Sequence, residues 1–285
     1  MNTFKTAMLL AGLTGLFVAV GGVIGGRSGM VTAFILAMIM NFASYWFSDK
    51  IVLMAQGAQE LQPSDAPELF RIVERLTARA GMPMPRIYVV PGDQPNAFAT
   101  GRDPEHAAVA VTQSIVDLLT PAELEGVLGH ELSHVRNRDV LISTVAATIA
   151  GAVGFLVQIA RWGMLLGGYG GRDDREGGYN PIAWLLAIIL APIAALIIQM
   201  AISRSREFEA DASGARLSGK PLALASALQK IEAYAQTRPL PVNPSFAHLY
   251  IVNPFRMEGL MNLFRSHPPT AERIARLQAM AAQAA

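Results

Sequence analysis

Four long stretches of the chain contain no charged side chain. They are Thr6 to Gly26, Ser28 to Ser48, Val140 to Ala160 and Gly177 to Ser203. Each stretch reaches the roughly 20 residues that a helix needs to cross a lipid bilayer. The pattern therefore predicts four membrane-spanning helices, two of them in segment 1–48 and two in segment 140–203.

The connections between these stretches predict two antiparallel hairpins. The first two stretches are joined only by "GGRSG", where glycine allows the positive φ angles of a sharp reversal. The last two are joined by "GGYGGRDDREGGYN", a glycine-rich sequence of mixed charge that is typical of an external loop. Two alternatives stay open: the first stretch is a signal peptide, or one of the last two is a buried core helix or a re-entrant segment.

The basic residues that flank the stretches predict their orientation. Cytoplasmic loops of membrane proteins carry an excess of Lys and Arg. One side of the predicted topology carries Lys5, Lys50, Arg136, Arg138, Arg204 and Arg206, and the other carries Arg27, Arg172 and Arg175. The first group is therefore expected in the cytoplasm, together with both chain termini.

Composition supports a membrane location and excludes two kinds of site. Hydrophobic residues make up 52% of the chain and charged residues only 16%, which lies outside the usual range of soluble proteins. The formal net charge of +1 offers no broad basic surface, so no nucleic-acid partner is expected. Because the chain has no cysteine, any metal ion must be held by His, Asp or Glu.

Segment 49–139 has the composition of a soluble domain. Its pattern predicts an amphipathic helix from Glu68 that stops at Gly81, followed by three short strands in "PRIYVV", "NAFAT" and "AAVAV". A second helix is expected to begin at Thr120, because Thr120, Pro121 and Glu123 match a capping box with proline in the first turn.

This second helix carries the sequence "GHELSH". On a helix, His130 and His134 lie about 40° apart around the axis and about 6 Å apart along it, so both imidazoles can reach one ion. Glu131 occupies the neighbouring position, where it can accept a proton from a water held by zinc. The alternative is a pair of structural histidines on a helix surface.

A catalytic zinc ion usually takes three protein ligands, and "EFEAD" after the fourth stretch offers the third. Glu207 and Asp211 share a helix face at i and i+4, whereas Glu209 points away. We expect Glu207 as the ligand and Asp211 as a partner that fixes an imidazole or the helix; a solvated acidic face is the alternative. An antiparallel pair of spans would return the chain, and with it Glu207, to the side that His134 occupies.

The two N-terminal spans, "GHELSH", two further spans and "EFEAD", in this order, resemble the HtpX-type integral-membrane zinc metallopeptidases. These are related more distantly to the CAAX prenyl endopeptidases of eukaryotes, and the resemblance covers nearly the whole chain. It implies a gluzincin-like site in which His130, His134 and Glu207 hold one zinc ion per subunit and Glu131 is the base. It also implies cleavage of damaged or misassembled membrane proteins on the cytoplasmic side of the bacterial inner membrane, in protein quality control and the stress response, with other quality-control proteases as partners.

Two further stretches resemble features of this family. In "PNAFATG", Asn96, Ala97 and Phe98 belong to what resembles an edge strand that binds an extended peptide; an ordinary strand and turn is the alternative. In "SHPPTAERI", His267 or Arg273 resembles a group that binds substrate or stabilises an oxyanion. The alternative there is a capped helix with a salt-bridged Arg273.

The expected fold is an α+β membrane protein, in which four transmembrane helices carry a mainly helical catalytic domain with a small β-sheet. The two parts of this domain are segments 49–139 and 204–285, and its partners are the lipid bilayer and protein substrates, chiefly membrane proteins. The rival functions are a prenyl-peptide endopeptidase, a membrane metal-binding or transport protein, and an inactive scaffold. Transport favours ionisable residues inside the spans, and the four stretches contain none. His106 and His248 have no partner pattern and are expected to be structural or surface residues.

Overall fold

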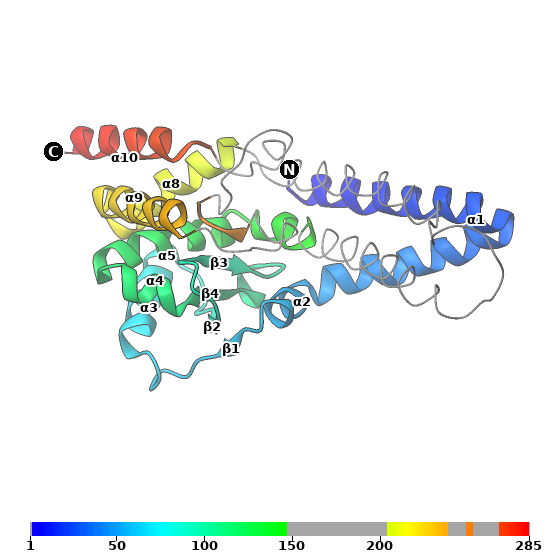
Figure 1. Ribbon diagram of the computed structural model, residues 1–285, viewed down its shortest axis with the longest axis horizontal. Helices are drawn as coiled ribbons and strands as arrows, with labels where there is room; N and C mark the ends of the chain where they lie inside the picture. Colours follow the sequence, from blue (N-terminus) through cyan, green and yellow to red (C-terminus); the bar gives the residue numbers. More distant parts are fainter. Residues whose placement is uncertain (1, 147–203, 239–248, 253–267, 285) are drawn as a thin grey trace, which may run out of the picture.

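The computed structural model describes residues 2–146, 204–238, 249–252 and 268–284. A mainly helical body with a small sheet lies beside a long helical hairpin made by the N-terminal residues (Figure 1). Residues 140–146, at the start of the expected third span, are helical. The rest of the third and fourth spans lies outside the described residues.

Helix α1 (Asn2–Trp46) folds back on itself at Gly26, so that its two halves run antiparallel (Figure 1). Gly26 has a φ of 56°, which glycine adopts without steric cost. The halves touch where Asn41 Nδ2 donates hydrogen bonds to the Leu10 carbonyl (3.2 Å) and to Thr14 Oγ1 (2.8 Å). The expected antiparallel pairing of the first two stretches is therefore present.

The second half of α1 has the character of a membrane span. Among the described residues, one segment, Gly26–Trp46, is long and apolar enough to cross a membrane, with 21 residues and a mean hydropathy of 1.5. A shorter apolar helix covers Thr6–Ala19. Large apolar side chains of the second half are 49–61% exposed, as contact with lipid requires: Val31, Phe34, Ile35 and Ile39.

The body begins at residue 48 and contains a mixed sheet. Its elements in chain order are α2 (Ser48–Ala55), β1 (Gln59–Glu60), α3 (Pro67–Ala80), β2 (Arg86–Val90), β3 (Ala97–Thr100), η1 (Pro104–His106), β4 (Ala108–Thr112), α4 (Gln113–Leu118), α5 (Pro121–Arg136), α8 (Arg204–Ser218), α9 (Pro221–Thr237) and α10 (Thr270–Ala284). The strand order is β1-β2-β4-β3, with β2 and β4 parallel and the other pairs antiparallel. The three predicted strands are confirmed, whereas β1 and α4 were not predicted.

Strand β4 lies inside the body because both of its faces are covered. Val109 and Val111 pack into the main hydrophobic core with residues of α3, α5 and α9, whereas Ala108 and Ala110 pack with residues of α2. All five residues of β4 are buried, which explains why the first four, Ala108 to Val111, are apolar without alternation. Within the described residues, strand β3 pairs with β4 alone and is the edge strand that contacts α5.

The predicted helix boundaries follow local capping chemistry. Helix α3 ends at Gly81, whose φ of 66° is the left-handed conformation that commonly terminates helices. Helix α5 begins with a complete capping box, in which the Thr120 side chain accepts from the Glu123 N–H and the Glu123 carboxylate accepts from the Thr120 N–H. Both predictions are confirmed.

Glu123 also joins α5 to the C-terminal helices. Its carboxylate accepts hydrogen bonds from Ser226 (2.6 Å) and Lys230 (2.8 Å) of α9. Burial opposes ionisation of Glu123, but these bonds lower its pKa to about 2. Helices α8 and α9 pack on α5, and α10 packs on α8 and α9. Together they complete a mainly helical α+β body with a small mixed sheet, in agreement with the coarse fold expected from the sequence.

Candidate metal centre

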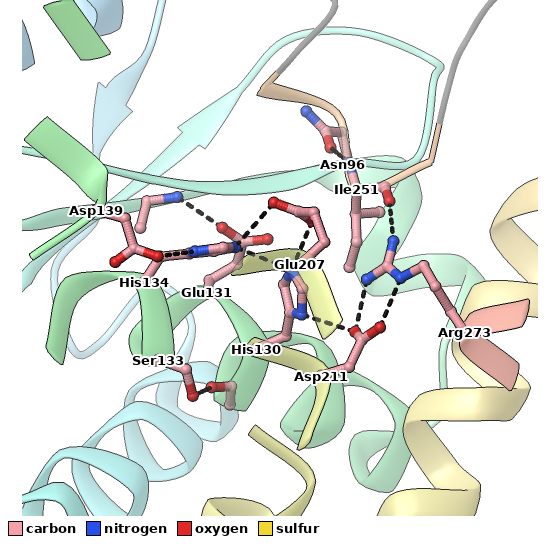
Figure 2. Close-up of polar contacts among 12 residues, drawn as sticks. Asn96, His130, Glu131, Ser133, His134, Asp139, Glu207, Asp211, Ile251 and Arg273 are labelled. Atoms are coloured by element: carbon pink, nitrogen blue, oxygen red, sulfur yellow. Dashed lines mark hydrogen bonds and ion pairs between the residues drawn. The ribbon is translucent and has the colours of Figure 1, made fainter. Parts of the chain in front are cut away.

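The histidine motif lies on α5 near the middle of the body. Residues 123–133 of this helix are all buried, because one side packs into the hydrophobic core and the other faces α8 and β3. His130 is 1% exposed and Glu131 is 7% exposed, whereas the side chain of His134 is 16% exposed. Figure 2 shows all three side chains converging on Glu207 of α8.

Helix α8 crosses α5 at very short range because both helices have glycine at the contact. A Cβ added to Gly214 would lie 2.5 Å from the backbone nitrogen of His130, and a Cβ added to Gly129 would lie 2.9 Å from the Gly214 carbonyl oxygen. The two backbones therefore touch directly beside His130. Asp211 and Glu207 precede Gly214 by about one and two helical turns, which brings both carboxylates to the histidines.

Three potential ligand atoms face one another. The Nε2 atoms of His130 and His134 are 3.2 Å apart, and Glu207 carboxylate oxygens lie 3.7 Å from the first and 3.6 Å from the second. One ligand atom from each residue lies within 4.8 Å of the others. Glu209, on the same helix, is exposed. The structure thus brings Glu207, and not Glu209, to the histidines.

A second carboxylate lies behind each histidine. His130 Nδ1 is 2.9 Å from Asp211 Oδ1, and His134 Nδ1 is 3.2 Å from Asp139 Oδ2. Asp211 is 3% exposed and Asp139 is 4% exposed. Each carboxylate favours the tautomer with the proton on Nδ1, which leaves the Nε2 lone pair available for a metal ion.

This donor set fits zinc. With both Nδ1 atoms turned toward carboxylates, the two Nε2 lone pairs face each other at 3.2 Å, and their repulsion is relieved only by a cation or a proton between them. Glu207 adds a negatively charged oxygen on the same side. Two imidazole nitrogens and one carboxylate oxygen form a common catalytic zinc set that leaves one position for water.

Asp139 reaches His134 because α5 ends in a Schellman motif. The Asp139 N–H bonds to the His134 carbonyl and the Arg138 N–H bonds to the Val135 carbonyl, both at 3.1 Å. Arg138 has a φ of 57°, in the left-handed region where glycine is usual and another residue loses roughly 1–2 kcal/mol. This turn carries the Asp139 side chain back alongside the imidazole of His134.

Arg273 holds Asp211 from the side opposite His130. Its Nε and Nη2 atoms donate to the two Asp211 oxygens at 2.7 Å each, and its Nη1 atom donates to the Ile251 carbonyl at 2.7 Å (Figure 2). Burial opposes ionisation of Asp211, but the Arg273 guanidinium and His130 hold its pKa well below the usual range. Arg273 is 1% exposed, so its contacts favour the salt bridge that the sequence left as the alternative to substrate binding.

A pocket opens beside the ligand atoms, between β3 and residues 249–251. It is lined by Phe98, Ala99, His130, Glu131, His134, Val140, Ser143, Glu207, Leu249, Tyr250 and Ile251. The Ala99 N–H donates to Glu131 Oε2 at 3.0 Å, so one carboxylate oxygen of Glu131 is held by the edge strand. Burial raises the pKa of Glu131, against the effect of the neighbouring histidines, which moves it toward the range of a group that exchanges protons at neutral pH.

The residues predicted to bind substrate divide into two groups. Ala97 and Phe98 lie in the edge strand, and Phe98 lines the pocket. Asn96 instead holds the opposite wall: its Nδ2 atom donates to the Leu249 carbonyl and its Oδ1 atom accepts from the Ile251 N–H, both at 3.2 Å. The side-chain amide of Asn96 therefore positions the pocket wall rather than pointing at the ligand atoms.

The remaining histidines are not part of this cluster as far as the structure describes them. His106 is exposed and pairs with Asp103 through its Nδ1 atom, as expected for a surface residue. His248 and the predicted substrate-binding residue His267 lie outside the described residues.

Comparison with known proteins agrees with this geometry. The family model described as "Peptidase family M48" matches residues 63–281. The chain belongs to peptidase family M48. A "Protease HtpX homolog" of Pyrococcus furiosus is 56% identical over 278 residues, which cover 97% of this chain and 95% of that protein. Another, from Desulforapulum autotrophicum, is 54% identical over 277 residues, covering 97% and 89%.

The fold of this M48 peptidase is similar to that of a solved structure. The crystal structure of S. mikatae Ste24p matches with a TM-score of 0.51 and 20% sequence identity, covering 96% of this chain and 64% of that one. The chain thus spans just under two thirds of the Ste24p chain. Family and geometry together identify a membrane-associated zinc metallopeptidase whose metal site is His130, His134 and Glu207, and proteins are its substrates.

Replacing Gly214 by alanine is expected to weaken zinc binding about 10- to 100-fold, the range seen when the residues that orient metal ligands are disturbed. The added methyl group would clash with backbone atoms of His130 and Gly129, which cannot turn aside as a side chain can. Helix α8 must therefore shift away from α5, and Glu207 shifts with it. Zinc content after gel filtration and competition with a chelator measure the loss. Gly15→Ala is the matched control, because a Cβ at Gly15 meets no atom within 4 Å. Equal zinc affinity in Gly214→Ala and the parent would contradict the role of the helix crossing.

Zinc binding is expected to release about one proton at pH 7. Burial lowers the pKa of His134, but Glu207 and Asp139 outweigh it and raise the pKa to about 9 in the metal-free protein. Zinc must displace that proton, so its apparent affinity should rise with pH up to about 9 and level off above. Calorimetry in two buffers of different ionisation enthalpy counts the protons. Asp139→Asn removes the carboxylate beside His134, so this variant should release fewer protons on binding zinc. A count near zero protons for the parent at pH 7 would refute this assignment.

Proposed function

We propose that this M48 peptidase is a membrane-bound endopeptidase that cleaves misfolded or damaged membrane proteins at the cytoplasmic face, as part of protein quality control and the stress response. The observation that carries the proposal is that residues from the start of an apolar stretch line the pocket beside the metal ligands. Val140 and Ser143 line the pocket and belong to helical residues 140–146, which begin the third apolar stretch. A peptide bond in this pocket therefore lies where the apolar helix starts.

The start of this helix also packs on the N-terminal hairpin. Leu141, Ile142, Val145 and Ala146 form a small apolar cluster, against which Leu10 and Phe17 of α1 pack. Thr144 links the same helix to the edge strand, since its Oγ1 atom lies 3.2 Å from Thr100 Oγ1. These contacts support a site that receives segments of membrane proteins close to the bilayer surface.

The proposed topology keeps the four spans expected from the sequence. Segments 1–48 and 140–203 form the two membrane hairpins, and segments 49–139 and 204–285 form one catalytic domain in the cytoplasm with both termini. The packing of α8 against α5 supports the joining of the last two segments. The excess of Lys and Arg on that side supports the orientation.

Glu131 is proposed as the general base and acid of peptide cleavage. Zinc, when bound, supplies a Lewis acid that polarises the scissile carbonyl and lowers the pKa of a water to roughly 7. Glu131 accepts a proton from the attacking water and returns it to the leaving amine, for which its raised pKa is suited. The Ala99 N–H holds one oxygen of Glu131 during this exchange.

Strand β3 is proposed to bind the substrate backbone. It is the edge of the sheet, and the Ala99 N–H that reaches Glu131 points away from β4, so the outer side of β3 faces the metal ligands. An extended peptide can add to such an edge by main-chain hydrogen bonds. Leu249, Tyr250 and Ile251 form the opposite wall of the pocket, and burial raises the pKa of Tyr250, so its phenol remains a hydrogen-bond donor at neutral pH.

A prenyl-peptide endopeptidase is the second candidate. The likeness of the fold to Ste24p favours it, although at 20% identity that likeness carries the fold alone. The two candidates differ in what anchors the substrate beside the pocket: a transmembrane segment or a prenyl group.

Glu131→Gln is expected to bind zinc like the parent and to lose roughly 10²- to 10⁴-fold in cleavage rate, because the variant cannot exchange the proton. The substrate is an unfolded loop carried on a membrane protein, assayed beside the same loop without its membrane segment and beside a prenylated peptide. The proposal predicts that the parent cleaves the membrane-anchored loop fastest. Cleavage by zinc-loaded Glu131→Gln at the parent rate would overturn the mechanism, and preferred cleavage of the prenylated peptide would establish the second candidate.

A further inference from the structure

A second pocket lies between the end of α1 and the loop that joins β3 to β4. Its aromatic lining comes from Phe42, Trp46 and Phe47. Its basic lining comes from Lys50 of α2, Arg86 of β2 and Arg102 of the loop. Figure 1 shows the end of α1 and α2 adjoining the sheet, so this pocket lies where the apolar hairpin meets the body.

The position of the pocket matches the boundary between lipid and water. The apolar segment Gly26–Trp46 ends at the pocket. Around its end the aromatic side chains are solvent-accessible, with Phe42 60%, Trp46 44% and Phe47 45% exposed. Aromatic rings gather at the ends of membrane spans because their apolar faces and polar edges suit the headgroup region.

Among the lysine, arginine, aspartate and glutamate residues that line the pocket, the basic ones outnumber the acidic ones by one. Asp49 and Glu105 are its acidic lining residues, against three basic ones. Arg86 is paired with Asp49 at 2.9 Å. Lys50 is exposed and lies 5.7 Å from the centre of the Phe47 ring, and within the described part of the chain it has no carboxylate partner.

The Arg102 guanidinium lies over the ring of Trp46, one of the aromatic side chains that line the pocket. It lies 4.7 Å from the centre of the Trp46 ring, and its Nη1 atom donates to the Trp46 carbonyl at 3.4 Å. Its Nε atom lies 3.4 Å from Asp103, a separation longer than that of a strong charge-assisted hydrogen bond. With Arg86 paired to Asp49, Lys50 and Arg102 offer two cations beside an apolar, aromatic surface, and Glu105 is the one other acidic residue of the lining.

We propose that this pocket binds the headgroup of an anionic phospholipid, with its phosphate between Lys50 and Arg102 and its acyl chains along Phe42 and Trp46. The net positive lining favours an anionic headgroup over a zwitterionic one. The exposed aromatic surface favours a lipid over a free phosphate ion, which has no apolar part to bury. The site goes beyond the peptidase function and does not depend on it.

A lipid bound here holds the catalytic body to the membrane next to the edge strand. Arg102 follows β3 by two residues, and Ala99 of that strand donates to Glu131. Gly101 between them has a φ of 138°, and a Cβ there would lie 2.5 Å from the His106 carbonyl oxygen, so the loop is tightly packed. The headgroup therefore steadies the strand that faces the metal.

The test measures which lipids the full-length protein retains. The parent is placed in nanodiscs of equal phosphatidylglycerol and phosphatidylcholine, extracted into mild detergent and examined by native mass spectrometry. We expect retention of phosphatidylglycerol over phosphatidylcholine, and a loss of roughly tenfold or more in the double variant Lys50→Gln/Arg102→Gln. The control Arg71→Gln/Arg216→Gln removes the same charge from exposed residues of α3 and α8 and should retain lipid like the parent.

Four results would overturn the proposal. Three of them concern lipid retention: equal retention of the two lipids by the parent, parent-like retention by Lys50→Gln/Arg102→Gln, and displacement of the retained lipid by millimolar inorganic phosphate. Zinc content and circular dichroism of each variant establish that it is folded, since neither substituted residue lies in the metal centre. A double variant that lost lipid only together with its zinc would also count against the site.

Discussion

The close crossing of α5 and α8 is the contact on which the metal centre depends. Gly129 and Gly214 let the two backbones touch beside His130, and no side chain separates them at that point. Because helices are rigid over a few turns, this one contact sets the positions of Glu207 and Asp211 relative to the histidines. The ligand from a distant part of the sequence is therefore placed by backbone packing and not by flexible side chains.

Buried charge then extends this arrangement to the substrate pocket. His130 contacts Asp211, Asp211 is held by Arg273, and Arg273 donates to the Ile251 carbonyl. Asn96 accepts from the N–H of the same Ile251. A chain of polar contacts thus connects the metal ligand to both walls of the pocket. Each member is buried, so removal of one leaves its partner uncompensated, at a cost larger than that of a surface ion pair.

Much of the site was predictable because its signals are local. The spacing of His130 and His134, the i and i+4 pair of Glu207 and Asp211, and the capping box at Thr120 are all set by helix geometry within a few residues. The left-handed Arg138, the partners of Arg273 and the pocket wall at 249–251 were not predictable in the same way, although a salt-bridged Arg273 was one of the alternatives. The partners of Arg273 and the pocket wall depend on contacts between segments far apart in the chain. Arg138 lies in a local turn, but an arginine at a position where glycine is usual does not signal that turn in the sequence.

The zinc content of two variants of α8 tests the central claim, that the helix crossing delivers one particular carboxylate to the histidines. Glu207→Ala removes the buried carboxylate beside His130 and His134, and Glu209→Ala removes an exposed one on the same helix. Each variant is purified from the membrane, saturated with zinc and passed through gel filtration before metal analysis. The account predicts that Glu209→Ala keeps about one zinc per chain, as in the parent, and that Glu207→Ala loses it. Retention of zinc by Glu207→Ala, or its loss from Glu209→Ala, would contradict the account.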